Sequence, residues 1–180
     1  MLEISKLKSL LPISIDDLEL RLFTEEDITE RYVAWLSDPE VVKYSNQRFK
    51  VQSMASCLDY FKTFEGSNSM FVAITVKDTG QMIGTMSVHS NALHETADVG
   101  IMLGDRNFWG KGLGKTAWDI LVKLLIDKGC VRKVTGGTLS CNHGMVKIMK
   151  GTGMQEDGMR RAQELVDGQA YDVVHYAKFS

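Results

Sequence analysis

One stretch of the chain, IMLGDRNFWGKGLGKT at residues 101–116, decides how the sequence is interpreted. It begins with apolar residues typical of a strand, passes through a turn with glycines at alternate positions, and enters an amphipathic pattern that predicts a long helix from about Gly112 to Lys128. Glycine permits conformations and close approaches that a side chain would block, so this turn can present several amide N–H groups in one direction. At a helix start those donors are unpaired and lie at the positive end of the helix dipole. The stretch therefore predicts a phosphate-binding cradle, with Lys111 and Lys115 as additional positive charge.

Two other phosphate-binding motifs do not fit the turn. A P-loop requires a glycine five positions before the glycine of the final Gly-Lys-Thr, and that position is Trp109 here. A dinucleotide fingerprint requires G-x-G-x-x-G, whereas the glycines of this turn alternate with other residues. A simpler alternative stays open, in which the glycines form only a tight connection and the lysines are solvated.

The rest of the chain alternates between strand and helix patterns. Strands are predicted at 18–23, 70–76, 82–88, 97–103, 131–139 and twice after residue 150, where Asp167-Gly168 joins them, and helices at 24–37, 53–65, 112–128 and 142–150. No linker or repeat separates these elements. Their order predicts a single-domain α/β (α+β) fold, in which a mixed sheet of about seven strands is flanked by about four helices.

The composition is that of an average folded domain of 180 residues, with 44% apolar and 24% charged residues. The formal net charge of -2 provides no positive field for a nucleic acid or an anionic membrane, so neither is an expected partner. No apolar run approaches the ~18 residues of a membrane span. Residues 1–14 lack the features of a secretory signal, and we expect them to be an N-terminal extension of one cytoplasmic domain covering residues 1–180.

Cysteine and histidine positions do not predict a metal site. Cys57, Cys130 and Cys141 share no ligand spacing, and the histidines are scattered along the chain. We therefore expect reduced thiols and no metal centre.

Three motifs carry a resemblance to a known family. The run WGKGLG at 109–114, after a strand and opening a helix, resembles the acyl-CoA-binding motif Q/R-x-x-G-x-G/A of the GCN5-related N-acetyltransferase (GNAT) family, with Trp109 in the first position. Asn142, followed by Gly153-Met154, is similar to the family's N-x-x-A/S…G-F pattern. The run WLSDPEV at 35–41 resembles the first helix of the branch of ribosomal-protein N-terminal (RimJ/RimL-type) acetyltransferases. The resemblance extends over nearly the whole chain from about Leu18.

The resemblance implies acetyl-CoA as the co-substrate and no metal. The pyrophosphate would lie on the amides of the glycine turn, and the pantetheine arm would pair with the strand before it, beside a neighbouring strand that diverges. Asn142 would contact the pantetheine, although asparagine is also a preferred helix cap. The implied cofactor-binding residues are Ile101, Met102, Leu103, Trp109, Gly110, Lys111, Gly112, Leu113, Gly114, Lys115, Thr116 and Asn142.

The implied reaction is direct attack of a neutral amine on the thioester in a ternary complex, with a backbone N–H near Met102 or Leu103 stabilising the oxyanion. The tyrosine and glutamate that many members use as acid and base are absent, since the corresponding positions are Met149 and, approximately, Gly137.

Two residues are therefore the candidate catalytic bases. Asp98 lies at a strand position where many members of the family keep an acidic residue, and His89 has an imidazole suited to proton transfer near neutral pH. Each has an ordinary alternative, because Asp98 can be a hydrogen-bonded strand residue and His89 can be solvated.

In this family the acceptor lies against the first two helices, their loop and the final hairpin, which implies Tyr44, Asn46, Arg48 and Tyr171 as substrate-binding residues. Arg48 could bind a phosphate or carboxylate, or form a surface salt bridge. The acceptor classes left open are a small amine or amino sugar and a protein N-terminus. The net charge does not favour a basic ribosomal partner, so the interpretation leans to a small molecule.

A second hypothesis follows from the absent tyrosine and glutamate, namely a non-catalytic acyl-CoA-binding or sensing domain of the same fold. Exposed sheet edges would also permit a homodimer.

Overall fold

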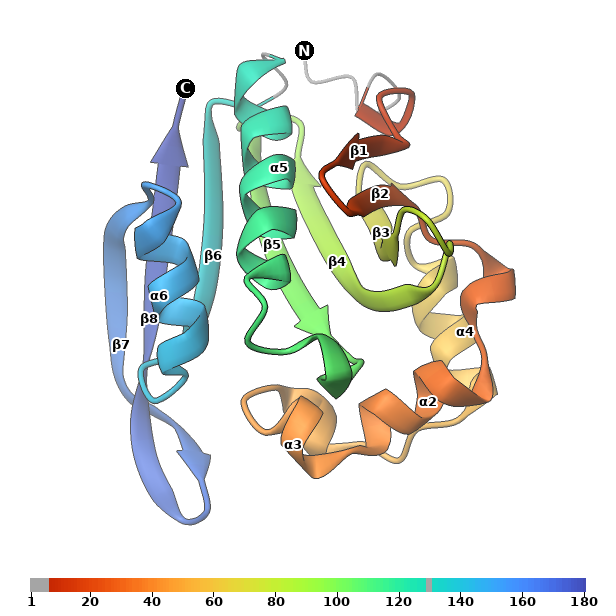
Figure 1. Ribbon diagram of the computed structural model, residues 1–180. Coiled ribbons are helices and arrows are strands. Elements are labelled where there is room, and N and C mark those ends of the chain that lie inside the picture. The colour runs from red at the N-terminus through yellow and green to blue at the C-terminus, as the bar shows by residue number, and fades with distance from the viewer. Residues whose placement is uncertain (1–6, 129–130) are drawn as a thin grey trace.

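The computed structural model describes residues 7–128 and 131–180 and has one eight-stranded mixed sheet at its centre (Figure 1). The strand order is β1-β2-β3-β4-β5-β6-β8-β7, and β5 and β6 are the parallel pair among otherwise antiparallel neighbours. The strands are β1 (Ile13–Ile15), β2 (Leu18–Leu22), β3 (Met70–Val76), β4 (Met82–Asn91), β5 (Thr96–Leu103), β6 (Lys133–Leu139), β7 (Gln155–Val166) and β8 (Gln169–Phe179). The predicted mixed sheet flanked by helices is confirmed, with β1 as a strand more than expected.

Helices cover both faces of this sheet. The α-helices are α2 (Glu30–Ser37), α3 (Pro39–Val42), α4 (Met54–Lys62), α5 (Leu113–Asp127) and α6 (His143–Gly151), and the 3-10 helices are η1 (Glu25–Asp27), η2 (Asn46–Phe49) and η3 (Arg106–Phe108). In Figure 1, α5 lies along β4 and β5, and α6 lies beside β6 and β8. The helices α2, α3 and α4 gather across the lower centre and lower right of the view.

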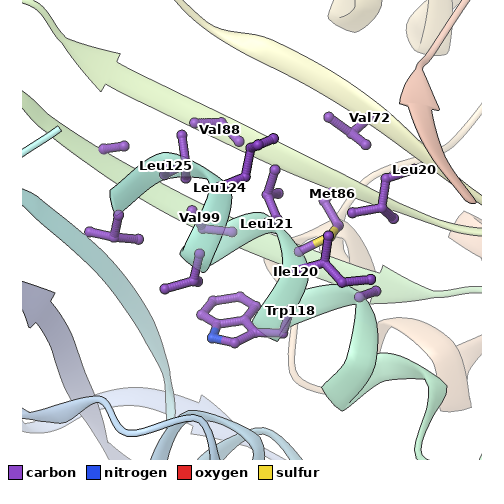
Figure 2. Close-up of a cluster of buried hydrophobic side chains, with 14 of the residues drawn as sticks. Leu20, Val72, Met86, Val88, Val99, Trp118, Ile120, Leu121, Leu124 and Leu125 are labelled. Atoms are coloured by element: carbon purple, nitrogen blue, oxygen red, sulfur yellow. The ribbon is translucent and has the colours of Figure 1, made fainter. Parts of the chain in front are cut away.

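The run MFVAITV of β3 is buried on both faces, which explains why it is apolar throughout rather than alternating. Val72 and Ile74 point to the core under α5, whereas Phe71 and Ala73 belong to a second apolar cluster under α2 and α4. Figure 2 shows the first core, in which side chains of α5 such as Trp118 contact those of four central strands.

The helix predicted from Thr24 to Ser37 is interrupted. Thr24 and Asp27 form the expected capping box, but they enclose only the short η1. The Asp27 carboxylate accepts two hydrogen bonds of 2.7 Å from Arg21 on β2 and thereby ties η1 to the sheet. A second cap at Thr29 then starts α2. The predicted stop at Asp38-Pro39 is confirmed, although Pro39 also opens α3 at its first position.

The described part of the segment expected to be an N-terminal extension packs on the sheet. Leu7 is fully buried in the core under α5. β1 pairs with β2 through Ile13 and Leu20 and forms one edge of the sheet.

The two parallel strands separate after a short ladder. Thr96, Ala97 and Asp98 of β5 pair with consecutive residues of β6, beginning at Lys133. Beyond Asp98, β5 continues its ladder with β4 alone, and β6 continues with β8 as far as Leu139. The implied divergence of the strands is confirmed, and the peptide groups on that side of β5 lose their neighbouring strand.

Candidate functional site

A cavity of about 900 Å³ opens where β5 and β6 separate. One half is walled by the end of β5, the start of α5 and the first turns of α6. The other half is walled by α2, α3, the segment leading to η2, and α4. The cavity therefore joins the predicted phosphate cradle to the segments expected to contact an acceptor.

The start of α5 has the geometry of an anion cradle. Gly112 is the N-cap residue, with a φ of +80°, and Gly110 has a φ of +73°, both in the left-handed region that favours glycine. The first intrahelical bond runs from the Thr116 N–H to the Gly112 carbonyl at 3.1 Å. The N–H groups of residues 113–115 precede it, and Gly112 has no side chain to cap them. These donors are available to an anion, since no side-chain cap competes for them.

Gly114 serves a different purpose from the two turn glycines. A Cβ at this position would lie 2.8 Å from Leu103 Cδ1, so its absence lets α5 approach the end of β5 closely. A Cβ at Gly110 or Gly112 would meet nothing within 4 Å, so their requirement is conformational.

The peptide groups of β5 point alternately to β4 and to the β6 side, as in any antiparallel ladder. The Ala97 carbonyl accepts from Thr135 on β6, which assigns the odd-numbered residues to the β6 side. Ile101 and Leu103 therefore turn their N–H groups to the gap, whereas the Met102 peptide group faces β4. The Leu103 carbonyl is already occupied, because it accepts a hydrogen bond of 2.8 Å from the Trp109 indole. Trp109 thus fastens the glycine turn to the end of β5.

Two predicted cofactor residues do not line the cavity. The Lys111 ammonium lies 5.2 Å from the centre of the Phe108 ring, and the Thr116 hydroxyl donates to the Gly112 carbonyl at 3.4 Å. Lys115 lines the cavity as expected, and Lys147 on α6 joins it. Lys147 was missed because its distance in sequence from the glycine turn gives no indication that α6 lies beside α5.

Asn142 caps α6 and lines the cavity at once. Its Oδ1 accepts from the Met145 N–H at 3.2 Å, and its Nδ2 donates to the Thr138 hydroxyl at 3.1 Å. Thr138 therefore sets the orientation of the amide.

The two candidate bases, His89 and Asp98, lie opposite each other in the register of the β4–β5 ladder. Neither of them lines the cavity. The Asp98 carboxylate is exposed and accepts a hydrogen bond of 2.6 Å from the Thr135 hydroxyl. The exposed His89 ring packs against Phe64 with 5.3 Å between ring centres. Both thus occupy the ordinary positions named as alternatives.

The positions of the family's acid and base are filled differently. Met149 is fully buried in the core. Gly137 lines the cavity, and the His175 ring from β8 fills the space beside it, with Nδ1 3.0 Å from where a Cβ would stand.

The predicted acceptor residues are only partly brought together. Tyr44 lines the cavity, whereas Asn46, Arg48 and Tyr171 do not. The Arg48 guanidinium donates to the Leu165 carbonyl at 3.0 Å and lies 3.7 Å from the Glu164 carboxylate. It therefore ties η2 to the β7–β8 hairpin.

Tyr171 donates its hydroxyl to Gln169 at 2.9 Å within that same hairpin and is not among the cavity-lining residues.

Two hydroxyl residues of the acceptor half were missed. Tyr60 of α4 and Ser87 of β4 both line the cavity. Tyr60 was hidden within an apolar helical stripe, and an isolated serine on a strand carries no sequence signal. Tyr32 also lines this half, where burial raises the pKa of its phenol.

No group of three or more histidine, cysteine or acidic side chains within residues 7–128 and 131–180 could hold a metal ion. Cys57 and Cys141 are free thiols, and Cys130 lies outside the described residues. In the part of the chain that the structure describes, no helix is both long and apolar enough to cross a membrane.

The sheet is mixed, and its parallel strands part beside a helix that a glycine opens. A family model described as the acetyltransferase (GNAT) domain matches residues 17–155. The chain therefore belongs to the GNAT acetyltransferase family.

Solved structures share the fold over nearly the full length. RimL, a ribosomal L7/L12 α-N-protein acetyltransferase in complex with coenzyme A, is 17% identical, with a TM-score of 0.80 over 93% of this chain and 97% of that one. The spermidine N-acetyltransferase of Vibrio cholerae, in complex with CoA and spermine, is 16% identical, with a TM-score of 0.79 over 91% and 95%. The microcin C7 self-immunity acetyltransferase MccE, in complex with acetyl-CoA and AMP, is 19% identical, with a TM-score of 0.78 over 92% and 94%. At these low sequence identities, the similarity shows that the fold is shared and nothing more.

An uncharacterized protein of Methanocaldococcus jannaschii is 21% identical over 147 residues. The match covers 82% of this chain but spans only 30% of the length of that protein.

Proposed function

We propose that this chain transfers an acetyl group from acetyl-CoA to a primary amine by direct attack in a ternary complex. The observation that carries the proposal is the single cavity that joins the N–H groups at the start of α5 to a polar acceptor half. A domain that only binds acyl-CoA would need only the half of the cavity beside the start of α5.

The residues of the first half fit the cofactor. The N–H groups of residues 113–115 can bind the pyrophosphate, and Lys115 and Lys147 add positive charge at the same wall. Ile101 can offer its free carbonyl to the pantetheine arm, because β6 has moved away. Asn142 offers the remaining hydrogen of its amide. Acetyl-CoA then supplies the thioester carbon that the amine attacks.

Oxyanion stabilisation is best assigned to the Ile101 N–H. Met102 turns its peptide group to β4, and Leu103 lies nearer the cradle, where the arm enters. Of the two N–H groups that face the gap, that of Ile101 therefore lies farther from the glycine turn than that of Leu103. A fixed backbone donor of this kind is often the largest electrostatic contribution to acyl transfer.

The acceptor half suits a small amine better than a polyamine. Glu40 is the carboxylate among the lining residues of the described chain, and Lys43 stands three residues away on the same wall. Several acidic residues would be needed to hold several ammonium groups. We therefore favour an acceptor with one amine, either a small molecule or a protein N-terminus, with Tyr44 among the residues that contact it. We place the protein in the cytoplasm, where free thiols such as those of Cys57 and Cys141 persist.

A non-catalytic acyl-CoA sensor is the second candidate, favoured by Met149 in the core and by Asp98 and His89 outside the cavity. A panel of primary amines with acetyl-CoA separates the two. Thiol release together with an acetylated product by mass spectrometry supports the transferase. Calorimetric binding of CoA without product from any amine supports the sensor.

A further inference from the structure

The segment between α3 and α4 forms one wall of the acceptor half, yet the apolar core does not hold it. Tyr44, Ser45 and Gln47 of this segment line the cavity. Farther along the segment, Phe49 is 72% exposed and Val51 is 95% exposed, so neither side chain anchors it to the core. Beyond α3, the position of the wall therefore depends on polar contacts.

The Arg48 side chain ties this segment to β7. Its Nη1 donates to the Ser45 carbonyl at 2.7 Å, within the segment, and its Nη2 donates to the Leu165 carbonyl at 3.0 Å, on β7. The Glu164 carboxylate lies 3.7 Å from Nη2, and the centre of the Phe49 ring lies 4.4 Å from the guanidinium carbon. Only 15% of the side chain is exposed. One planar guanidinium thus joins two carbonyls that are far apart in sequence.

A bulge in β7 precedes the carbonyl that the guanidinium reaches. The register of the β7–β8 ladder shifts between Arg160 and Glu164. Within this bulge, the Ala162 N–H donates to the Asp172 carboxylate at 2.7 Å. A bulge bends its strand, and β7 is the edge of the sheet, so a carbonyl that points outward beyond the bulge has no partner strand. The Leu165 carbonyl is in this position and is therefore available to the guanidinium.

The same hairpin is attached to the wall of the cavity on β6. The Ser140 N–H, just after β6, donates to the Asp172 carbonyl on β8 at 2.8 Å. Thr138 of β6 lines the cavity. In Figure 1 the β7–β8 hairpin extends past the other strands to the level of α3. Contacts thus run from the β6 wall through the hairpin to Arg48 and the wall at residues 43–47.

We propose that Arg48 is a positioning residue for the acceptor, because its guanidinium holds residues 43–47 against the β7–β8 hairpin in the arrangement that binds the amine. The inference rests on the proposed function. Arg48 does not line the cavity, so it acts through Ser45 and Gln47. The Ser45 hydroxyl accepts from the Gln47 N–H at 3.2 Å, and the Gln47 side chain accepts from Gln52 at 2.9 Å. Both lining side chains are therefore oriented once the segment is held.

Loss of this tie should weaken binding of the amine and leave the chemical step intact. A wall that moves freely must be ordered when the amine binds, which costs free energy in the ground state and the transition state alike. Such a loss of uniform binding raises KM without lowering kcat. CoA binding should not change, because the cradle at the start of α5 and the Asn142 amide belong to other elements.

The test substitutes methionine for Arg48 in the full chain, which keeps an unbranched stem and removes the guanidinium. Arg132→Met is the matched control, because Arg132 also joins distant segments, donating to the His94 carbonyl at 2.9 Å, and lies outside the cavity lining. The substrate is the amine of the panel with the highest kcat/KM. Its KM should rise about 10-fold in Arg48→Met, with kcat and the Kd for CoA within about twofold of the wild type. In the control all three should stay within about twofold.

Two further variants separate the planar fork from its charge. Arg48→Lys keeps a positive charge beside Glu164 but lacks the fork, so its KM should stay raised about fivefold or more. Glu164→Gln removes the partner charge and leaves the Leu165 carbonyl, so its KM should change less than about twofold, as expected for a partly exposed ion pair. Full recovery in Arg48→Lys, or a 10-fold rise in Glu164→Gln, would overturn the role of the fork.

Hydrogen exchange tests the tie without any substrate. The N–H groups of Ser45 and Lys50 are bonded to carbonyls three residues earlier, so their exchange reports on the order of this segment. Peptides covering residues 43–52 should exchange about 10-fold faster in Arg48→Met than in the wild type, whereas Arg132→Met should leave them unchanged. Peptides covering α5 should be unchanged in both variants.

Unchanged exchange over residues 43–52 in Arg48→Met would overturn the inference whatever the activity of the chain. If the wild type acetylates amines while Arg48→Met keeps KM within about twofold, or loses kcat and CoA affinity together with KM, the positioning role is overturned and the transferase stands. If the wild type acetylates no amine in the panel, the proposed function fails and the acceptor role of Arg48 fails with it.

Discussion

Substitution of Gly112 by alanine should separate CoA binding from folding. Gly112 has a φ of +80° and open space around its Cβ position, so Gly112→Ala introduces conformational strain without a clash. The left-handed conformation costs a residue with a Cβ about 1–2 kcal/mol, which lowers Tm by roughly 2–8 °C in a chain of this size. Relief of that strain turns the Leu113 N–H away from the cradle.

The loss of one charge-assisted hydrogen bond to the pyrophosphate is worth about 1.5–3 kcal/mol, or roughly 10- to 100-fold in the Kd for CoA. Gly168→Ala is the matched control, because Gly168 in the β7–β8 turn also has a φ of +80° and open space around it. Thermal unfolding and calorimetric titration with CoA should show similar losses of stability in both variants but a loss of affinity only in Gly112→Ala. Equal CoA affinity in the two variants would refute the cradle assignment.

Three smaller perturbations have distinct readouts. Gly100→Ala should displace the Ser87 hydroxyl from its place in the cavity wall and lower kcat/KM for the amine about 10-fold, with stability changed by less than about 1 kcal/mol in urea unfolding. Trp109→Phe should remove the indole bond to β5, lower stability by about 1 kcal/mol and weaken CoA binding, which calorimetry measures. Burial raises the pKa of Asp27, but hydrogen bonds, chiefly from Arg21, outweigh it and lower that pKa overall. Asp27→Asn should therefore be less stable than the wild type at pH 7, and the difference should shrink progressively as pH falls below the ordinary aspartate pKa of about 3.9.

The cofactor half of the site is local in sequence, which is why residue spacing predicts it. Gly112 and Gly114 follow β5 after only the short η3, and the hydrophobic pattern of the helix that they open fixes where its unpaired N–H groups begin. Asn142 likewise stands immediately before the helix that it caps.

The acceptor half depends on contacts that the sequence pattern does not contain. Tyr60 and Ser87 line the same cavity because α4 packs against β3 and β4, and nothing in either segment indicates that packing. Arg48 resembles a ligand-binding arginine in sequence, but the β7–β8 hairpin supplies its partners. Thr24 has every feature of a helix cap, yet the tie between Asp27 and β2 restricts its helix to one turn.

A crystal structure of the chain with CoA tests the central claim most directly. We predict pyrophosphate oxygens within hydrogen-bond distance of the N–H groups of residues 113–115, and the pantetheine arm in the gap beside Ile101. A pyrophosphate bound elsewhere on the surface, or an arm that does not enter between β5 and β6, would contradict the account.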